Sequence, residues 1–292
     1  MSSAPANQNV TIRRAQPSDG EICGRICCEA FTRLNQHHGF PPDFPSPQVA
    51  VEVLSSVFSN PRCFCVVAEQ GDKILGSNCM DERAVIRGIG PVTVSLDGQN
   101  AGVGRLLMEA VIAHAQEGGA AGLRLVQAAF HNRSLSLYAK LGFDVREPLA
   151  CLQGRTAQRA VEGCCLRAAT VEDQPACDAL ARAVHGFERS RELAQAIEDG
   201  SAKVAVRDGR ITAYATEVSF FGHATAETNA DMQALIASAE TFAGPGILVP
   251  SRNAPLMRWC LENGLRVVQP MTLMSVGFYN EPAGAWLPSI FF

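Results

Sequence analysis

Three segments of the chain occur twice, and the two sets follow the same order along the sequence. Written as first copy and second copy, they are VTIRRAQPSD (10–19) and CLRAATVEDQ (165–174), VVAEQGDKILG (66–76) and KVAVRDGRITAY (203–214), and HNRSLSLYAKLGFDV (131–145) and RNAPLMRWCLENGLRV (252–267). Segments that recur in order are copies of one structural unit. The sequence therefore predicts two tandem domains of one fold, at residues 1–155 and 163–292, joined by a polar stretch.

The composition is that of a globular protein with reduced thiols. Hydrophobic residues make up 47% of the 292 residues and charged residues 18%, which is enough apolar material for two cores. The net charge of −4 provides no basic field for nucleic acid or an anionic membrane. No apolar run approaches the ~20 residues that span a bilayer, and the first residues lack the pattern of a secretory signal. The eleven cysteines include no C-x-x-C pair, so we expect no metal site and a cytoplasmic location.

Hydrophobic periodicity outlines the elements of the first copy. It predicts strands at 10–14, 63–69, 73–80, 90–96 and 123–128, and helices at 19–35, 48–58, 104–116 and 132–141. The strand, glycine turn, helix and strand between 90 and 128 form a crossover, whose two strands run parallel. We therefore expect an α/β fold in which each copy is a mixed, partly parallel sheet flanked by helices. The apolar terminal segment AWLPSIFF (285–292) is expected to pack between the copies.

A glycine-rich turn leads into the helix at 104–116, in the sequence GQNAGVGRLL (98–107). A helix N-terminus carries unpaired amides and a partial positive charge, so it attracts anions. Gly102 and Gly104 would let phosphate oxygens approach those amides without meeting a Cβ atom. The alternative is that both glycines only shape a tight turn. A nucleoside triphosphate loop is disfavoured because Arg105 stands where lysine is needed, and a dinucleotide loop lacks its third glycine because position 107 is Leu107.

The wider pattern is more specific than the turn alone. The spacing Q-x-x-G-x-G from Gln99 to Gly104, after a β-branched strand and before an amphipathic helix, resembles the pyrophosphate-binding segment of the GNAT superfamily of acetyl-CoA-dependent N-acetyltransferases. Downstream, RSLSLYAKLGF (133–143) resembles that family's second signature, a helix with a tyrosine before a Leu-Gly-Phe turn. The resemblance covers residues 10–150. The second copy resembles a diverged domain without a coenzyme site, because ETNADMQALIASAE (227–240) contains no glycine.

The resemblance implies which residues hold acetyl-CoA. The pantetheine arm pairs with the strand that ends at Val94, and the pyrophosphate lies on the amides from Asn100 to Arg105. The family has asparagine seven residues before its tyrosine, where this chain has His131 followed by Asn132, and either could face the coenzyme. The implied coenzyme-binding residues are Val92, Thr93, Val94, Gln99, Asn100, Ala101, Gly102, Val103, Gly104, Arg105, His131 and Asn132.

The resemblance also implies a mechanism. An amine attacks the thioester directly, an amide near Val94 stabilises the oxyanion, and Tyr138 donates a proton to the leaving thiolate. The alternative for Tyr138 is a core aromatic among leucines, and Trp259 replaces it in the second copy. An amine of pKa ~10 must lose a proton before it attacks, which requires a base. Candidate bases are Glu29, His37, His38, Asp81 and Glu82.

These residues predict an N-acetyltransferase that moves an acetyl group from acetyl-CoA to a primary amine of a small molecule, with no nucleic acid or membrane partner. Two alternatives stay open at this point. The first is a regulator that binds acetyl-CoA without catalysis, and the second is an acyltransferase that uses a longer acyl-CoA.

Overall fold

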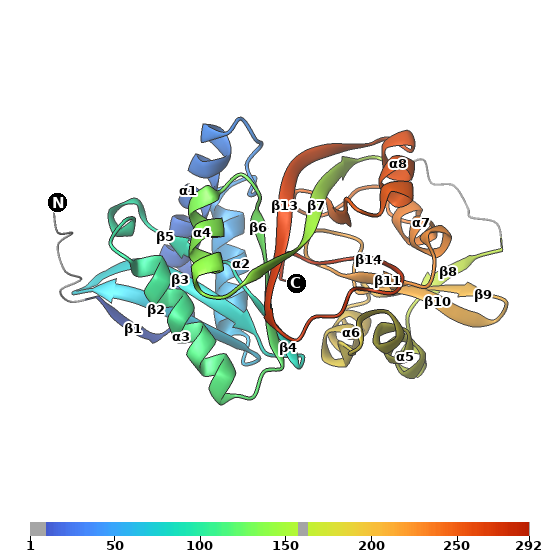
Figure 1. The fold of residues 1–292 in the computed structure, drawn as a ribbon, viewed down its shortest axis with the longest axis horizontal. Coiled ribbons are helices and arrows are strands. Elements are labelled where there is room, and N and C mark those ends of the chain that lie inside the picture. The colour runs from blue at the N-terminus through green and yellow to red at the C-terminus, as the bar shows by residue number, and fades with distance from the viewer. Residues whose placement is uncertain (1–9, 157–162, 292) are drawn as a thin grey trace. The chain divides into compact units, whose positions relative to one another are not determined.

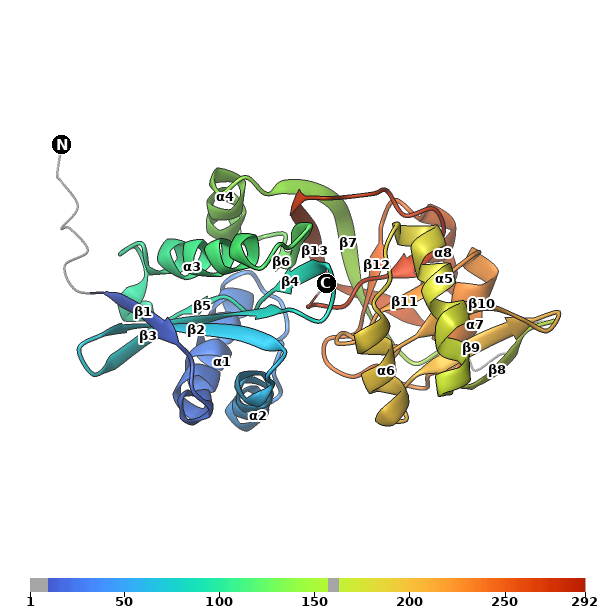
Figure 2. The same cartoon turned by 90° about the horizontal axis from the view of Figure 1, so that it is seen from below.

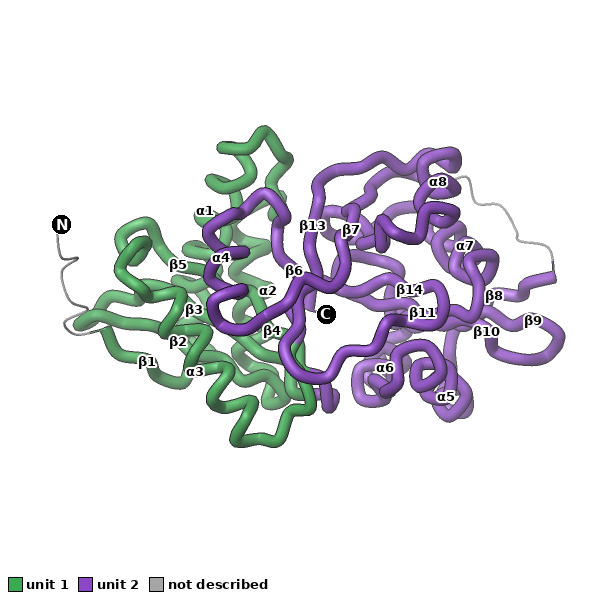
Figure 3. Tube along the Cα trace, viewed as in Figure 1, with its two compact units in different colours: residues 1–82, 87–123 green, residues 83–86, 124–292 purple. Residues whose placement is uncertain are grey.

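The computed structural model describes residues 10–156 and 163–291 (Figure 1). The chain divides into two compact units, which Figure 3 colours separately. Unit 1 comprises Met1–Glu82 and Arg87–Leu123, and unit 2 comprises Arg83–Ile86 and Arg124–Phe292. The short segment at 83–86 therefore leaves the first unit and joins the second.

Unit 1 is an antiparallel sheet with helices on both faces. Its strands β1 (Thr11–Arg14), β2 (Cys63–Gln70), β3 (Lys73–Asp81) and β4 (Ile86–Ile89) lie side by side in that order, and β5 (Thr93–Val94) pairs with β3. After the 3₁₀ turn η1 (Pro17–Asp19), α1 (Gly20–His37) and α2 (Pro47–Ser59) cover one face of the strands. Figure 2 shows α3 (Val103–Glu117) on the other face.

The helices of unit 1 form where their buried residues recur at helical spacing. In α3 the buried side chains are those of Val103, Leu107, Met108, Val111 and Ala115, a stripe with the 3.6-residue period of a helix. Under α1 and α2 the core is rich in thiols, because Cys23, Cys27, Cys65 and Cys79 pack there with Leu54 and Phe58. All eleven cysteines of the chain are free thiols, and only Cys164 and Cys165 are not buried.

Unit 2 contains a five-stranded antiparallel sheet. It also contains a second group of four strands, except for the first two residues of β6 (Gly122–Ala128), which belong to unit 1. The sheet order is β14 (Ala285–Leu287), β11 (Ala224–Ala226), β10 (Arg210–Ala215), β9 (Lys203–Arg207) and β8 (Cys165–Ala168). The second group has the order β6, β13 (Leu265–Gly277), β7 (Asp144–Gly154) and β12 (Ile247–Pro250). Its helices are α4 (Asn132–Lys140), α5 (Gln174–His185), α6 (Ser190–Glu198), α7 (Asn229–Ala237) and α8 (Ala254–Glu262), with a 3₁₀ turn η3 at Val171–Asp173.

The order of elements repeats, which confirms the predicted tandem α/β fold. The series β8, α5, α6, β9, β10, β11, α7, β12, α8, β13 follows the series β1, α1, α2, β2, β3, β4, α3, β6, α4, β7 element by element. One ion pair recurs with it. Arg13 binds the carboxylate of Asp19 at 2.7 and 3.0 Å, and Arg167 binds Asp173 at 2.5 and 2.7 Å, each pair spanning six residues. This pair explains why those residues match between the two copies of the sequence.

The last strands of the two copies are exchanged. The strand order is β6, β13, β7, β12. The last strand of the second copy, β13, therefore lies beside β6 of the first copy, and the last strand of the first copy, β7, lies beside β12 of the second copy. The antiparallel ladder between β7 and β13 runs from Gly154 opposite Leu265 to Asp144 opposite Ser275. Because α4 and β7 of the first copy thus belong to unit 2, the compact units do not divide where the repeats do. The domain limits 1–155 and 163–292 remain a prediction about the two copies.

Local differences from the predicted elements have simple causes. The strand expected at 90–96 is reduced to Thr93–Val94, because Pro91 has no amide hydrogen for a ladder. The side chain of Ser95 then caps the 3₁₀ turn η2 (Leu96–Gly98). The terminal segment adds β14 beside β11, with Trp286 buried, whereas Phe292 lies outside the described residues. No helix in the described ranges has the length and apolar character to cross a membrane.

Candidate functional site

The predicted coenzyme strand is β5, and it pairs with β3 in an antiparallel ladder. Val94 is paired with Gly76 and Thr93 with Ser77, and the Ser95 amide donates to the Leu75 carbonyl at 2.7 Å. A Cβ atom on Gly76 would lie 2.3 Å from the Thr93 carbonyl oxygen, so only glycine permits this approach. Gly76 was not among the predicted site residues, although a glycine inside a predicted strand is a signal for close backbone approach.

The loop that follows β5 ends in an open helix N-terminus. Asn100 has a φ of 66° and Gly102 a φ of 79°, and these left-handed residues turn the chain into α3, for which Gly102 is the N-cap. The amides of Arg105 and Leu106 donate to the Gly102 carbonyl at 3.0 and 3.1 Å. Within the part of the chain that the structure describes, the amides from Ala101 to Gly104 donate to no acceptor. The loop thus presents consecutive amides that an anion can bind.

The side chains of this loop leave its amides accessible. Asn100, Ala101, Gly102 and Arg105 are exposed, whereas Val103 is 1% exposed and anchors the start of α3 in the core. Arg105 pairs with Glu109 at 2.7 Å on the exposed face of the helix. An exposed pair of this kind contributes little to stability, so its guanidinium can turn to a bound phosphate at small cost.

The corresponding helix of the second copy is closed by its own carboxylate. Thr228 is the N-cap of α7 and accepts a hydrogen bond from the Asp231 amide at 3.2 Å, while its hydroxyl donates to the Asp231 carboxylate at 2.6 Å. Asp231 is 1% exposed and binds Arg207 at 3.1 Å. A buried carboxylate at this helix start repels pyrophosphate. That the second copy lacks a coenzyme site stays a prediction.

Tyr138 lies on α4 in unit 2, with 7% of its surface exposed. Burial raises the pKa of Tyr138 to about 12, against an opposing hydrogen bond with Ser134. The Ser134 hydroxyl also lies 2.7 Å from Nδ1 of His131, the N-cap of α4. Asn132 begins the helix and is exposed. Tyr138 therefore keeps its proton at neutral pH. Of the two residues predicted to face the coenzyme, His131 has a side chain that contacts a neighbouring hydroxyl, whereas the side chain of Asn132 is exposed.

The five candidate bases all lie in unit 1 and have different surroundings. Glu29, His37 and His38 are exposed, and the rings of the two histidines contact each other edge to face at 4.8 Å. Glu82 binds Arg87 at 2.9 Å and His114 at 3.1 Å, which engages its carboxylate. Asp81 is half-buried at the end of β3. In the described ranges no group of three or more His, Cys, Asp or Glu side chains is placed to hold a metal.

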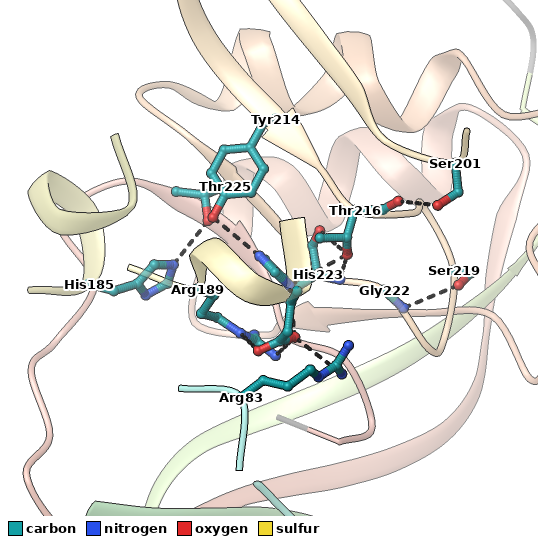
Figure 4. A network of polar contacts seen from close by, with 11 residues as sticks. Arg83, His185, Arg189, Ser201, Tyr214, Thr216, Ser219, Gly222, His223 and Thr225 are labelled. Atoms are coloured by element: carbon teal, nitrogen blue, oxygen red, sulfur yellow. Dashed lines mark hydrogen bonds and ion pairs between the residues drawn. The ribbon is translucent and has the colours of Figure 1, made fainter. Parts of the chain in front are cut away.

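Unit 2 contains a buried polar network that the sequence analysis missed (Figure 4). Arg189 binds Glu192 through two hydrogen bonds of 2.7 and 2.6 Å, and Glu192 lies 3.6 Å from Nδ1 of His223. Nε2 of the same histidine lies 3.2 Å from the Tyr214 hydroxyl. Arg83, from the segment at 83–86, approaches Glu192 to 3.9 Å. Arg189 and Glu192 lie three residues apart at the start of α6, but Arg83, Tyr214 and His223 come from other segments, so periodicity gives no signal for the network.

The charges of this network follow from its burial. Burial opposes ionisation of Glu192, yet the charge of Arg189 and the hydrogen bond from His223 hold the pKa of that carboxyl below its usual range. Burial, with the charge of Arg189, lowers the pKa of His223 to about 4. At neutral pH the network therefore holds a carboxylate, a guanidinium and a neutral histidine.

We expect the free energy of unfolding to fall as the pH is lowered from about 6.5 to about 4, in part because of His223. The unfolded histidine takes up its proton near pH 6.5, whereas the folded one does so near pH 4. Between these values the unfolded state binds more protons, so acidification stabilises it by up to about 3 kcal/mol for this one group. Urea unfolding at pH 7 and pH 4.5 measures the loss. The variant His223→Gln should show a smaller difference between the two pH values, and an equal difference would assign the effect to other groups.

Comparison with known proteins identifies the fold of the chain and a family that part of the chain resembles. Residues 32–143, which include the loop at 99–105 and Tyr138, match the Acetyltransferase (GNAT) family. Among solved structures, a proposed acetyltransferase from Pyrococcus horikoshii is 17% identical, with a TM-score of 0.73 over 98% of this chain and 97% of its own. A GCN5-related N-acetyltransferase from Sphaerobacter thermophilus is 15% identical, with a TM-score of 0.58 over 96% and 98% of the two chains.

A third solved structure is of a tandem protein. It is a tandem GNAT protein from the clavulanic acid biosynthesis pathway, 14% identical, with a TM-score of 0.55 over 92% of this chain and 98% of its own. At such identities these likenesses establish the fold, while the family match includes the loop at 99–105. No curated protein matches this sequence. Residues 32–143 are thus similar to the GNAT family of acetyltransferases, and the whole chain has the fold of these solved structures, one of them a tandem GNAT protein.

Proposed function

We propose that the chain transfers an acetyl group from acetyl-CoA to a primary amine of a small molecule, and that the amine attacks the thioester directly. The observation that carries the proposal is the run of backbone amides from Ala101 to Gly104 that donate to no acceptor among the described residues. Consecutive amides at a helix N-terminus form a site for a pyrophosphate. Acetyl-CoA is the donor of the family that this loop matches.

The proposal assigns separate tasks to the strand and to the loop. β5 is held against β3 through Gly76, and in the proposal the backbone from Val92 to Val94 binds the pantetheine amides. The amides from Ala101 to Gly104, with the Arg105 guanidinium, bind the pyrophosphate, whereas the Arg105 amide, which the sequence also assigned to it, donates to the Gly102 carbonyl at 3.0 Å. An amide near Val94 stabilises the negative charge that develops on the thioester oxygen, because a fixed donor needs no reorganisation during the reaction.

Tyr138 acts on the leaving sulfur. Its pKa of about 12 keeps the hydroxyl protonated throughout the physiological range. A thiol of pKa ~8.5 is the stronger acid of the two. Tyr138 therefore stabilises the departing thiolate by donating a hydrogen bond, and full proton transfer to sulfur is completed from solvent. This role needs only the hydroxyl, which Trp259 of the second copy cannot supply.

Calorimetric titration of acetyl-CoA into the protein tests the proposal, with NAD and ATP as controls. We expect one site per chain for acetyl-CoA and none for either control, because α7 of the second copy is closed by Asp231. Release of free thiol in the presence of a panel of amines then measures transfer. Two sites per chain would contradict the closed second copy, and no binding would overturn the proposed function. Binding without turnover with any amine would instead favour a regulator that senses acetyl-CoA.

A further inference from the structure

Three polar side chains lie on one face of α4. His131 is the N-cap of this helix, and Ser134 and Tyr138 follow three and seven residues after it. Residues with this spacing share one side of a helix, and a long side chain leans back over the turn before it. The Ser134 hydroxyl lies 2.7 Å from Nδ1 of His131 and also forms a hydrogen bond with Tyr138. The three side chains therefore form one continuous chain of hydrogen bonds within a single segment of unit 2.

Ser134 uses its hydroxyl differently from the other serine of this helix. Ser136 is exposed and donates to the Asn132 carbonyl at 2.8 Å, a common bond of a serine inside a helix. Ser134 is half-buried and contacts two side chains. The corresponding helix of the second copy, α8, has the sequence APLMRWCLE, with no serine, histidine or tyrosine. The copy that lacks the tyrosine thus also lacks the serine that bonds to it.

The direction of this chain decides where the proton of Tyr138 points. A serine hydroxyl has one proton, so it donates one hydrogen bond. If Ser134 donates to His131, it accepts from Tyr138, and the tyrosine proton is held within the helix. If Nδ1 of His131 carries a proton and donates to Ser134, the serine donates to the tyrosine oxygen, and the tyrosine proton is available to another acceptor.

The second direction agrees with the electrostatics of Tyr138. Burial raises the pKa of this tyrosine, and the hydrogen bond with Ser134 opposes the rise. A bond lowers the pKa of a tyrosine when it stabilises the ionised oxygen, which is the effect of a neighbour that donates to that oxygen. The contact with Ser134 is therefore consistent with a serine that donates to Tyr138.

We propose that His131 and Ser134 are positioning residues for Tyr138: Nδ1–H of His131 donates to Ser134, and Ser134 donates to the Tyr138 oxygen. This role rests on the proposed acetyl transfer, in which the tyrosine hydroxyl donates to the leaving thiolate. A hydroxyl that accepts one hydrogen bond donates a stronger one, because the bonds of a chain polarise one another. The three groups keep their own protons, and the chain sets only the direction in which each is donated.

The variant Ser134→Ala tests the positioning role in the full chain. It should lower kcat by about tenfold, the effect of one lost hydrogen bond, with little change in KM for either substrate. Ser136→Ala is the matched control, because it makes the same substitution at an exposed position of the same helix, and it should leave kcat unchanged. Equal losses for the two variants would assign the effect to the helix and would overturn the role of Ser134.

A double-mutant cycle with Tyr138→Phe separates positioning from packing. Because Ser134 acts through the tyrosine hydroxyl, Ser134→Ala should have no further effect on kcat once that hydroxyl has been removed. A second loss of about tenfold in the Tyr138→Phe background would mean that the serine acts independently of the tyrosine, and the proposal would be wrong.

The direction of the chain can be measured without turnover. Nitrogen-15 NMR of the histidine rings at pH 7 distinguishes a ring nitrogen that carries a proton from one that does not, and the signals of His131 are identified by their loss in His131→Asn. We expect a protonated Nδ1 in the unmodified protein and a shift of its signal in Ser134→Ala. An unprotonated Nδ1, or the same signal in both proteins, would overturn the chain.

The two kinds of measurement separate this inference from the proposed function. If amines are acetylated but the histidine spectrum or the cycle disagrees, the positioning role is wrong and acetyl transfer stands. If the spectrum agrees but no amine is acetylated, the proposed function fails. The hydrogen-bond chain then remains as a feature of α4, and its role in positioning a catalytic tyrosine is overturned.

Discussion

Replacement of Gly104 by glutamate should weaken acetyl-CoA binding by about a hundredfold and leave the protein folded. Gly104 is the second residue of α3, beside amides that donate to no acceptor in the described chain. A carboxylate in the first turn favours the helix by up to about 1 kcal/mol, so stability is preserved or slightly increased. The same carboxylate repels the pyrophosphate. At an effective dielectric constant near 20 that repulsion is of order 3 kcal/mol, or about a hundredfold in affinity.

Two matched variants isolate the charge from other effects of Gly104→Glu. Gly104→Gln has the same size without the charge and should retain a larger part of the affinity in the same calorimetric titration. Ala230→Glu places the carboxylate at the second residue of α7, the corresponding helix of the second copy, where it is exposed. It should leave acetyl-CoA binding unchanged. Equal losses for Gly104→Glu and Ala230→Glu would mean that the coenzyme does not bind at the first helix.

Local pattern was sufficient to predict the architecture of each copy. The repeated segments predicted the tandem fold, because residues that stabilise the fold recur at the same positions in both copies. Arg13 and Asp19 bind each other in the same way as Arg167 and Asp173, six residues apart in both copies. The glycine turn could be predicted for a related reason. The left-handed backbone at Gly102 and the open amides after it depend on residues that are adjacent in sequence.

Pairing between distant segments could not be predicted in this way. A repeat in the sequence marks the copies, but which strand β7 adjoins is decided by the side chains of both copies together. The segment at 83–86 gives no sign that it joins unit 2, where Arg83 approaches Glu192. Gly76 carried a weak signal, since its task appears only when Thr93 lies against it. Site residues that depend on contacts between distant segments could be identified only from the structure.

The variant Tyr138→Phe should lower kcat by about a hundredfold and leave the affinity for acetyl-CoA nearly unchanged. The hydroxyl is the only atom removed, and its proposed task, stabilising the leaving thiolate, arises only in the transition state. The ring keeps its place, because Tyr138 is buried on α4 with its centre 6.3 Å from that of Phe143. Steady-state release of thiol, together with calorimetry of acetyl-CoA, separates the effect on kcat from the effect on binding.

The pH dependence and a second tyrosine distinguish this role from packing. Because the pKa of Tyr138 is about 12, its hydroxyl is protonated up to about pH 11, and kcat should show no decline from this group below that pH. Tyr214→Phe removes another buried hydroxyl in unit 2, one that is bonded to His223. It should reduce the melting temperature more than Tyr138→Phe does, with little change in kcat at 25 °C. If Tyr138→Phe lowered only stability and left kcat intact, the tyrosine would be a core aromatic, and another group would have to stabilise the leaving sulfur.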